Sequence, residues 1–256
     1  MIKARPARAL AVAVVLTAMG AAGQAKAQSS GPQGTGFYVR ADLGVAFSTQ
    51  ADTRDDDCGS PNPFFGCGTS LDSSAGSSIA VGGGFGYRVN RWFRTDATVT
   101  WRPLFDVSGT VVRAGTPDRS FQADVSSVTG MLNGYLDIAG LLPPGKLDRF
   151  RPYVGAGLGV AVNDISSIGA VTPGGAPGTE MLPDGTHASP AWMFTAGTGI
   201  EAGYGFIVDL GYKYVDMGSF KSNAGQACAG AACRNIDAVT GDLQAHEFSA
   251  GLRFEF

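Results

Sequence analysis

The stretch His246-Glu247-Phe248-Ser249 holds two side chains that hydrolases combine, an imidazole base and a hydroxyl nucleophile. Such a pair works only when the two groups lie within hydrogen-bond reach. Side chains of a β-strand alternate between its faces, so a spacing of three places His246 and Ser249 on opposite faces unless a bulge intervenes. The chain's other histidine, His187, is distant in sequence, between strand candidates. The sequence therefore predicts no catalytic residues.

Four carboxylates in the segment 49–77 could instead hold a divalent cation, because carboxylate oxygens are ligands that calcium prefers. Their order does not match the D-x-[DN]-x-[DN]-G pattern of an EF-hand loop, and a solvated acidic loop is the alternative. The pattern is therefore only a weak indication of a metal site, and its candidate ligands are Asp52, Asp55, Asp56 and Asp57.

The four cysteines are expected to form two local disulfides, Cys58–Cys67 and Cys228–Cys233. Both pairs lie in Gly-rich segments, and an exported chain meets an oxidising compartment. A zinc site is the alternative. It fits worse, because neither pair combines the usual short spacing with a nearby histidine.

Export is predicted by the N-terminus, which has the three parts of a secretory signal peptide. A basic region with Lys3, Arg5 and Arg8 precedes a short apolar stretch, and Ala25-Lys26-Ala27 is an A-x-A cleavage site. We expect residues 1–27 to be removed and residues 28–35 to form a short polar leader.

Charge and glycine pattern exclude two classes of partner. The predicted signal peptide takes four of the 19 basic residues and none of the 22 acidic ones, so the remaining chain has a net charge of about −7. A chain of this sign is not a nucleic-acid binder. Gly155-Ala156-Gly157-Leu158-Gly159 departs from the G-x-G-x-x-G spacing and precedes no amphipathic helix, so no dinucleotide cofactor is expected.

The elements that carry these residues are strands. The segment 245–256 alternates without a break between a mostly apolar face, which includes Phe248 and Leu252, and a face with Glu247 and Arg253. Seven earlier segments alternate in the same way, with Gly and Pro in the gaps. The eight predicted strands span residues 36–48, 78–89, 92–102, 125–137, 150–163, 190–202, 206–215 and 245–256.

The connections between these strands alternate in length. Long connections span residues 49–77, 103–124, 164–189 and 216–244, whereas the intervening ones are short. Long loops at one end and short turns at the other are the pattern of a transmembrane β-barrel whose termini lie on the short-turn side.

The faces opposite the apolar ones carry seven basic and seven acidic side chains. Charges at the middle of a bilayer cost roughly 2–4 kcal/mol each, so we expect them in the lumen, where opposite charges can pair. A soluble barrel with a solvated charged exterior is the alternative. The fourteen predicted lumen residues are Arg40, Asp42, Arg88, Arg94, Asp96, Arg102, Asp137, Arg151, Glu201, Asp209, Lys213, Glu247, Arg253 and Glu255.

Three stretches resemble the strands of small Gram-negative outer-membrane β-barrel proteins, the OmpA-like and opacity-type surface proteins. They are Leu132-Asn133-Gly134-Tyr135-Leu136-Asp137, Arg151-Pro152-Tyr153-Val154-Gly155-Ala156-Gly157-Leu158-Gly159 and Asp209-Leu210-Gly211-Tyr212-Lys213-Tyr214-Val215-Asp216. The resemblance implies an all-β, eight-stranded, antiparallel up-and-down barrel over residues 36–256, with long extracellular loops. It also implies localisation in the outer membrane, with a periplasmic leader and periplasmic termini.

The resemblance further implies partners. Membrane lipid and lipopolysaccharide would surround the barrel, and the barrel-insertion machinery would read the aromatic C-terminal strand. The residues of that assembly signal are Phe248, Leu252, Phe254 and Phe256.

Several functions fit such a barrel. The first hypothesis is a non-enzymatic surface protein with a lumen plugged by charged side chains. It would support envelope integrity or surface recognition through its loops. An adhesin that binds an extracellular ligand through the first and fourth long loops is the alternative. A lipid A-modifying enzyme or a narrow channel is a third hypothesis.

Overall fold

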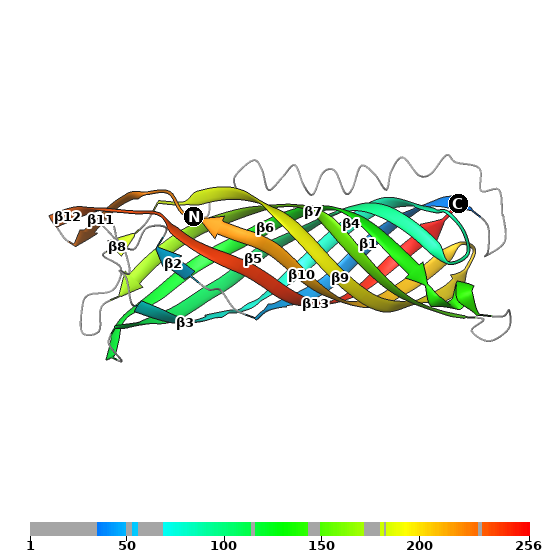
Figure 1. Ribbon diagram of the computed structural model, residues 1–256, viewed down its shortest axis with the longest axis horizontal. Coiled ribbons are helices and arrows are strands. Elements are labelled where there is room, and N and C mark those ends of the chain that lie inside the picture. The colour runs from blue at the N-terminus through cyan, green and yellow to red at the C-terminus, as the bar shows by residue number, and fades with distance from the viewer. Residues whose placement is uncertain are drawn as a thin grey trace.

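The computed structural model describes residues 35–49, 53–55, 69–113, 116–142, 149–171, 180–181, 183–229 and 232–256. The expected signal peptide and nearly all of the expected leader lie outside these residues. Eight long strands form the body of the molecule (Figure 1): β1 (Gly36–Ser48), β4 (Ser77–Arg88), β5 (Phe93–Arg113), β6 (Thr116–Asp137), β7 (Phe150–Val171), β9 (Gly185–Gly203), β10 (Phe206–Lys221) and β13 (Val239–Glu255). The shorter elements are β2 (Thr53–Asp55), β3 (Thr69–Ala75), β8 (Glu180–Met181), β11 (Gly225–Ala229), β12 (Ala232–Ile236) and a 3-10 helix, Ile138–Leu141.

The eight long strands form one closed antiparallel sheet, which confirms the predicted fold. Neighbours follow in chain order from β1 through β4, β5, β6, β7, β9 and β10 to β13, and β13 pairs back with β1. The closing register sets Ala41 opposite Leu252 and Val45 opposite Phe248. Figure 1 shows an elongated barrel with the C-terminus at one end and the short strands gathered at the other. No helix within the described ranges is long and apolar enough to cross a membrane.

Tight turns join β4 to β5 and β9 to β10 at the C-terminal end, whereas the longer connection from β6 to β7 begins with the 3-10 helix. Between β4 and β5, the Asn90 side chain accepts hydrogen bonds from the backbone N–H groups of Trp92 (2.9 Å) and Phe93 (2.8 Å). Between β9 and β10, Gly203 and Gly205 flank Tyr204, and all three residues have positive φ. The values are 91° for Gly203, 55° for Tyr204 and 81° for Gly205. Glycine adopts this backbone region readily, which explains the Gly-Tyr-Gly sequence.

The connections at the other end are strands for much of their length. β5 runs to Arg113 and β6 starts at Thr116, so the expected loop 103–124 is mostly a β-hairpin. β7 continues to Val171, and β10 and β13 also extend into the expected loops. The prediction of four long loops was therefore wrong in extent. The Gly, Ser and Pro content of these segments indicates loops, but strand pairing persists through them.

The two faces of the sheet exchange polarity along the barrel. In the half nearer the C-terminal end, the outward side chains are apolar, as predicted. We call them the apolar belt: Leu43, Val45, Ile79, Phe85, Val99, Leu132, Val154, Leu158, Val160, Phe194, Leu210, Phe248 and Leu252. Beyond the belt, in a part we call the outer extension, the outward faces carry Asp106, Asp164, Asp216 and Asp242. There the inward side chains are apolar, so the predicted rule, apolar outside and charged inside, holds only for the belt.

A bulge produces this exchange on β5, whereas on β10 a bulge follows the exchange, because Val215 and Met217 already point inward before it. The β5–β6 register shifts between Arg102 and Phe105, so both Arg102 before the bulge and Phe105 after it point inward. On β10 the register shifts between Asp216 and Ser219, at Gly218 with φ of 64°. The buried Asn163 amide donates to the backbone carbonyl oxygens on either side of Gly218, those of Met217 (2.8 Å) and Ser219 (2.9 Å), and thereby fixes this bulge.

Arginine substitutions should distinguish the belt from the extension. Leu158, 73% exposed, lies midway along the apolar belt, and Ser108 is exposed on the extension. In phospholipid vesicles, Leu158→Arg is expected to lower the free energy of unfolding by about 2–4 kcal/mol, because the charge enters hydrocarbon. Ser108→Arg is expected to change it by less than about 0.5 kcal/mol. Guanidinium titration of both variants measures this, and equal losses would contradict the assignment of the belt.

Candidate functional site

The interior of the belt is filled by ion pairs in successive layers. Nearest the C-terminal end, Arg88 contacts both Asp137 (2.7 Å) and Glu255. Glu255 also pairs with Arg253 at 3.0 Å and with Arg151 at 3.6 Å. Arg151 in turn pairs with Glu201. These charges come from β4, β6, β7, β9 and β13, so the layer ties together strands from all round the barrel.

The next layer surrounds Arg94, whose side chain is fully buried. Its Nε lies 3.1 Å from Asp137, and its guanidinium stacks over the rings of Tyr135 and Tyr153, 4.1 and 4.8 Å from their centroids. Beside it, Arg253 pairs with Asp209 at 3.0 Å. Guanidinium groups bind favourably to aromatic faces, so the rings stabilise a charge that water cannot reach.

Asp96 is the acceptor at the centre of a third layer. It receives hydrogen bonds from the Tyr38 hydroxyl at 3.0 Å, from Arg40 at 3.2 Å and from the Asn133 amide at 2.7 Å. Arg40 also makes two hydrogen bonds to Asp42, at 2.7 and 2.9 Å. A buried carboxylate with several donors is well compensated for its loss of hydration.

Glu247 is the acceptor in the layer nearest the outer extension. Its carboxylate, 1% exposed, forms ion pairs with Arg102 at 2.7 Å and with Lys213 at 2.9 Å. Arg102 also donates to the Thr129 hydroxyl at 3.1 Å. A cavity of about 10 Å³ lies between this layer and that of Arg40, which is room for roughly one water molecule. Each of the fourteen charges expected in the lumen thus takes part in at least one ion pair there.

Small residues make room for these side chains. A Cβ on Gly86 would lie 2.6 Å from the Tyr38 hydroxyl oxygen, and one on Gly155 would lie 2.6 Å from Tyr135 Cδ1. On β7, Gly155 thus gives space to Tyr135, and the neighbouring Gly157 gives space to Asn133. The buried tyrosines Tyr38, Tyr135 and Tyr153 were not among the predicted lumen residues, although each points to the same face as its neighbouring charges.

The interior of the outer extension is a second, apolar core. Among the described residues its largest side chains, Phe105, Ile165, Met217 and Phe220, are fully buried. The cluster comprises Ala46, Phe105, Val107, Ala123, Val125, Met131, Ala161, Ile165, Ala191, Met193, Val215, Met217, Phe220, Val239, Leu243 and Ala245. The charged layers therefore meet a packed apolar interior, as in a water-soluble protein.

The structure separates the candidate hydrolytic pair. β13 keeps continuous register with β1 from Ala245 to Glu255, so His246 points outward and Ser249 toward the lumen. His246 lies instead beside Tyr212, whose hydroxyl is 2.5 Å from its Nδ1. His187 lies on β9, opposite Asn163 of β7.

Most of the acidic and cysteine candidates of the first long connection lie outside the described residues. These are Asp52, Asp56, Asp57, Cys58 and Cys67. Asp55 belongs to β2, where its backbone pairs with Val239. Cys228 and Cys233 are direct partners in the β11–β12 hairpin, so a Cys228–Cys233 disulfide stays a prediction that non-reducing peptide mapping would decide.

The residues of the predicted assembly signal lie on the outer face of β13. Phe248 and Leu252 are exposed, at 58% and 46%. Phe254 packs edge-on against Phe256, with ring centroids 5.2 Å apart, and the Phe256 backbone N–H donates to the Phe37 carbonyl.

Removal of one central carboxylate tests how strongly the layers depend on pairing. Glu247→Gln leaves Arg102 and Lys213 buried without a counter-charge, so the free energy of unfolding is expected to fall by about 3–5 kcal/mol. Asp106→Asn, on the exposed face of the extension, is the matched control and should change it by less than about 0.5 kcal/mol. Urea titration in detergent micelles measures both values. Equal stability of the two variants would show that pairing inside the belt contributes little.

Comparisons with known proteins agree with this geometry. A family model for an outer membrane protein beta-barrel domain matches residues 11–256. A Rickettsia felis protein named "Putative adhesin" is 24% identical over 246 residues, which cover 87% of this chain and 88% of that protein. An uncharacterised Brucella abortus protein is 25% identical over 256 residues, covering 88% of this chain and 86% of that protein.

Two solved structures also align with this chain. Outer membrane protein OprG from Pseudomonas aeruginosa aligns with a TM-score of 0.49 at 15% identity, over 88% of this chain and 99% of OprG. Neisserial surface protein A aligns with a TM-score of 0.48 at 16% identity, over 87% of this chain and 99% of that protein. Because the family model covers almost the whole sequence, the chain belongs to the outer membrane protein beta-barrel domain family and resides in the outer membrane.

Proposed function

We propose that this chain is a closed, non-enzymatic surface barrel that holds a rigid β-structured platform above the outer membrane for recognition of an extracellular ligand. The observation that carries the proposal is the filled interior, with paired charges inside the belt and an apolar core inside the extension. A barrel filled in this way offers its outer end, rather than its lumen, to other molecules.

Two different barriers support the closed lumen. A hydrated ion entering from the outer end would first meet the apolar core around Phe105 and Phe220, where it would lose its water. It would then have to separate pairs such as Arg102–Glu247, whose side chains are nearly inaccessible to solvent. The cavity between the layers, about 10 Å³, has room for roughly one water molecule and is too small for a hydrated ion.

The outer extension supports a role in recognition. Strand pairing continues beyond the belt on β5, β6, β7, β9, β10 and β13, and the β11–β12 hairpin projects farther still (Figure 1). Loops held on rigid strands are common sites of binding. Related chains with the printed name "Putative adhesin" make attachment the first activity to test.

The proposal omits catalysis because the groups that could act together are apart. His246 and Ser249 lie on opposite faces of β13, and its register with β1 contains no bulge between them. A serine–histidine mechanism needs these groups in contact.

Planar bilayer recordings test closure. The refolded chain is expected to show no stable unitary conductance in potassium chloride, because both cores obstruct the lumen. Stepwise, long-lived conductance in protein whose folding is verified by its heat-dependent gel mobility would contradict the closed lumen.

Excision of the hairpin tests recognition. The Ser222 and Val239 backbones are hydrogen-bonded at its base, at 2.9 Å, so residues 224–237 can be replaced by a two-residue Asn-Gly turn with little strain on β10 and β13. Escherichia coli displaying the full chain should adhere to epithelial monolayers and immobilised fibronectin above vector controls. The excised variant should fall to the vector level while retaining its heat-dependent gel mobility. The adhesive role would be overturned if bacteria that display the full chain adhered to both surfaces no better than the vector controls.

A further inference from the structure

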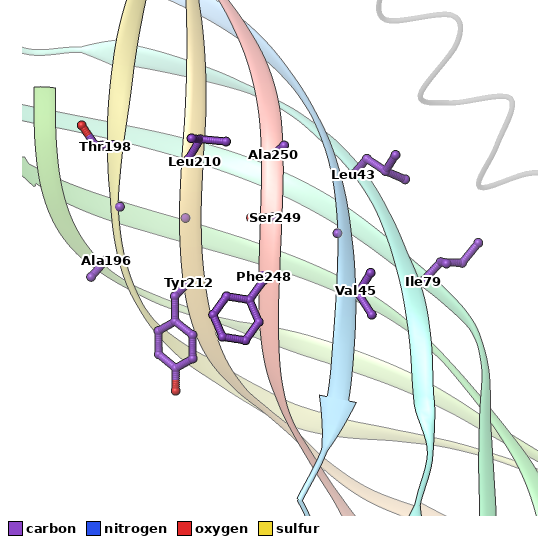
Figure 2. A pocket seen from close by; sticks show the side chains of 13 residues that line it. Leu43, Val45, Ile79, Ala196, Thr198, Leu210, Tyr212, Phe248, Ser249 and Ala250 are labelled. Carbon is purple, nitrogen blue, oxygen red and sulfur yellow. The ribbon is translucent and has the colours of Figure 1, made fainter. Parts of the chain in front are cut away.

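The apolar belt has a depression on the side formed by β4, β1, β13, β10 and β9 (Figure 2). Its volume is about 680 Å³. In the sheet register, Leu43, Ala250 and Leu210 lie in one row across the strands. Because the alanine methyl is short, the row has a gap between the two leucines, and Figure 2 shows Ala250 between Leu43 and Leu210.

The wall and floor of the depression are apolar. Phe248 lies next to Ala250 along the face of β13, with Val45 and Tyr212 on either side in its own row. The floor is the backbone of lumen-facing residues that carry little or no side chain: Gly44, Gly197, Gly211 and Ser249. A hydrocarbon chain would thus be contacted on three sides, whereas a polar ligand would find few partners there.

Polar groups border the end of the depression nearer the extension. The Tyr212 hydroxyl lies 2.5 Å from His246 Nδ1. When Nδ1 accepts this hydrogen bond, the neutral imidazole carries its proton on Nε2 and can donate to an oxygen outside the barrel. Tyr214 lies beside the ring, 5.3 Å between centroids, and its hydroxyl donates to the Gln244 side chain at 2.9 Å.

This order of groups matches the cross-section of the outer leaflet. The polarity of β13 changes between Phe248 and Gln244, so His246 lies at the membrane surface and the depression just below it. Tyrosine and tryptophan favour the same interface, and Trp192 is 5.4 Å from Tyr214. An occupant must have acyl chains in the belt and an oxygen acceptor at His246. The lipid of the outer leaflet with this chemistry is lipopolysaccharide.

We propose that the depression at Ala250 is a docking site for an acyl chain of the lipid A part of lipopolysaccharide, with a lipid oxygen accepting a hydrogen bond from His246 Nε2. The site lies on the outer wall of the barrel and is independent of the closed lumen and of ligand recognition by the extension.

Native mass spectrometry of the refolded full chain with purified Kdo₂-lipid A as the probe tests this site. Ala250→Phe fills the gap with a side chain that still suits the belt. Ala156→Phe, on an outward position of β7 outside the depression, is the matched control. Retained lipid A is expected to fall at least tenfold in Ala250→Phe and to be unchanged in Ala156→Phe. His246→Phe should weaken retention by about tenfold, the effect of one lost hydrogen bond.

Three results would overturn the proposal. One is equal retention of lipid A by the Ala250→Phe and Ala156→Phe proteins. Another is retention of phosphatidylethanolamine as strong as that of lipid A, which would make the depression a general lipid contact. The third is a dimer that forms without lipid and disappears in Ala250→Phe, which would make the depression an interface between two copies of the chain.

Discussion

Every charged layer in the lumen of this barrel contains ion pairs that join side chains of different strands. Glu247 of β13 holds Arg102 of β5 and Lys213 of β10, and Asp137 of β6 holds Arg88 of β4 and Arg94 of β5. Such contacts exist in one register alone, because a slip of one residue would turn each charge toward lipid. Removing one partner leaves the other buried without compensation. The ion pairs therefore fix the register, and the register determines where every outward residue meets the membrane.

The same strands leave the bilayer without ending, and this continuity explains the second core. Outside the membrane the outward face must be polar and the inward face apolar, the reverse of the belt. β13 makes the change within one unbroken strand, from outward Phe248 and inward Glu247 to outward Asp242 and inward Leu243. On β10 the change also precedes the bulge, whereas on β5 the bulge produces it. Within the described residues, the result is a membrane barrel joined to a barrel packed like a soluble protein.

The eight-stranded barrel and the charges of its interior could be predicted from the sequence. Strict alternation and a balanced set of fourteen charges are visible before the pairing of the strands is known. The outer extension was harder to predict. Phe105-Asp106-Val107-Ser108 continues the alternation of Trp101 in phase, so the sequence alone places Phe105 on the outer face. The bulge at Pro103 and Leu104 turns Phe105 inward instead. The lumen tyrosines were missed because an aromatic residue in a membrane strand first suggests a lipid contact. The depression at Ala250 could not be predicted, because it depends on which residues of β1 and β10 lie beside that alanine.

The central claim is that polarity changes sides at the membrane surface, close to His246. Site-directed spin labels at outward positions of β13, from Leu252 through Ala250, Phe248 and His246 to Gln244 and Asp242, measure this directly in lipid vesicles. Collision with oxygen reports hydrocarbon, and collision with a water-soluble nickel chelate reports solvent. Labels at 252, 250 and 248 are predicted to favour oxygen, and labels at 244 and 242 to favour nickel. Oxygen preference that persists through position 242, or nickel preference already at 250, would contradict the account.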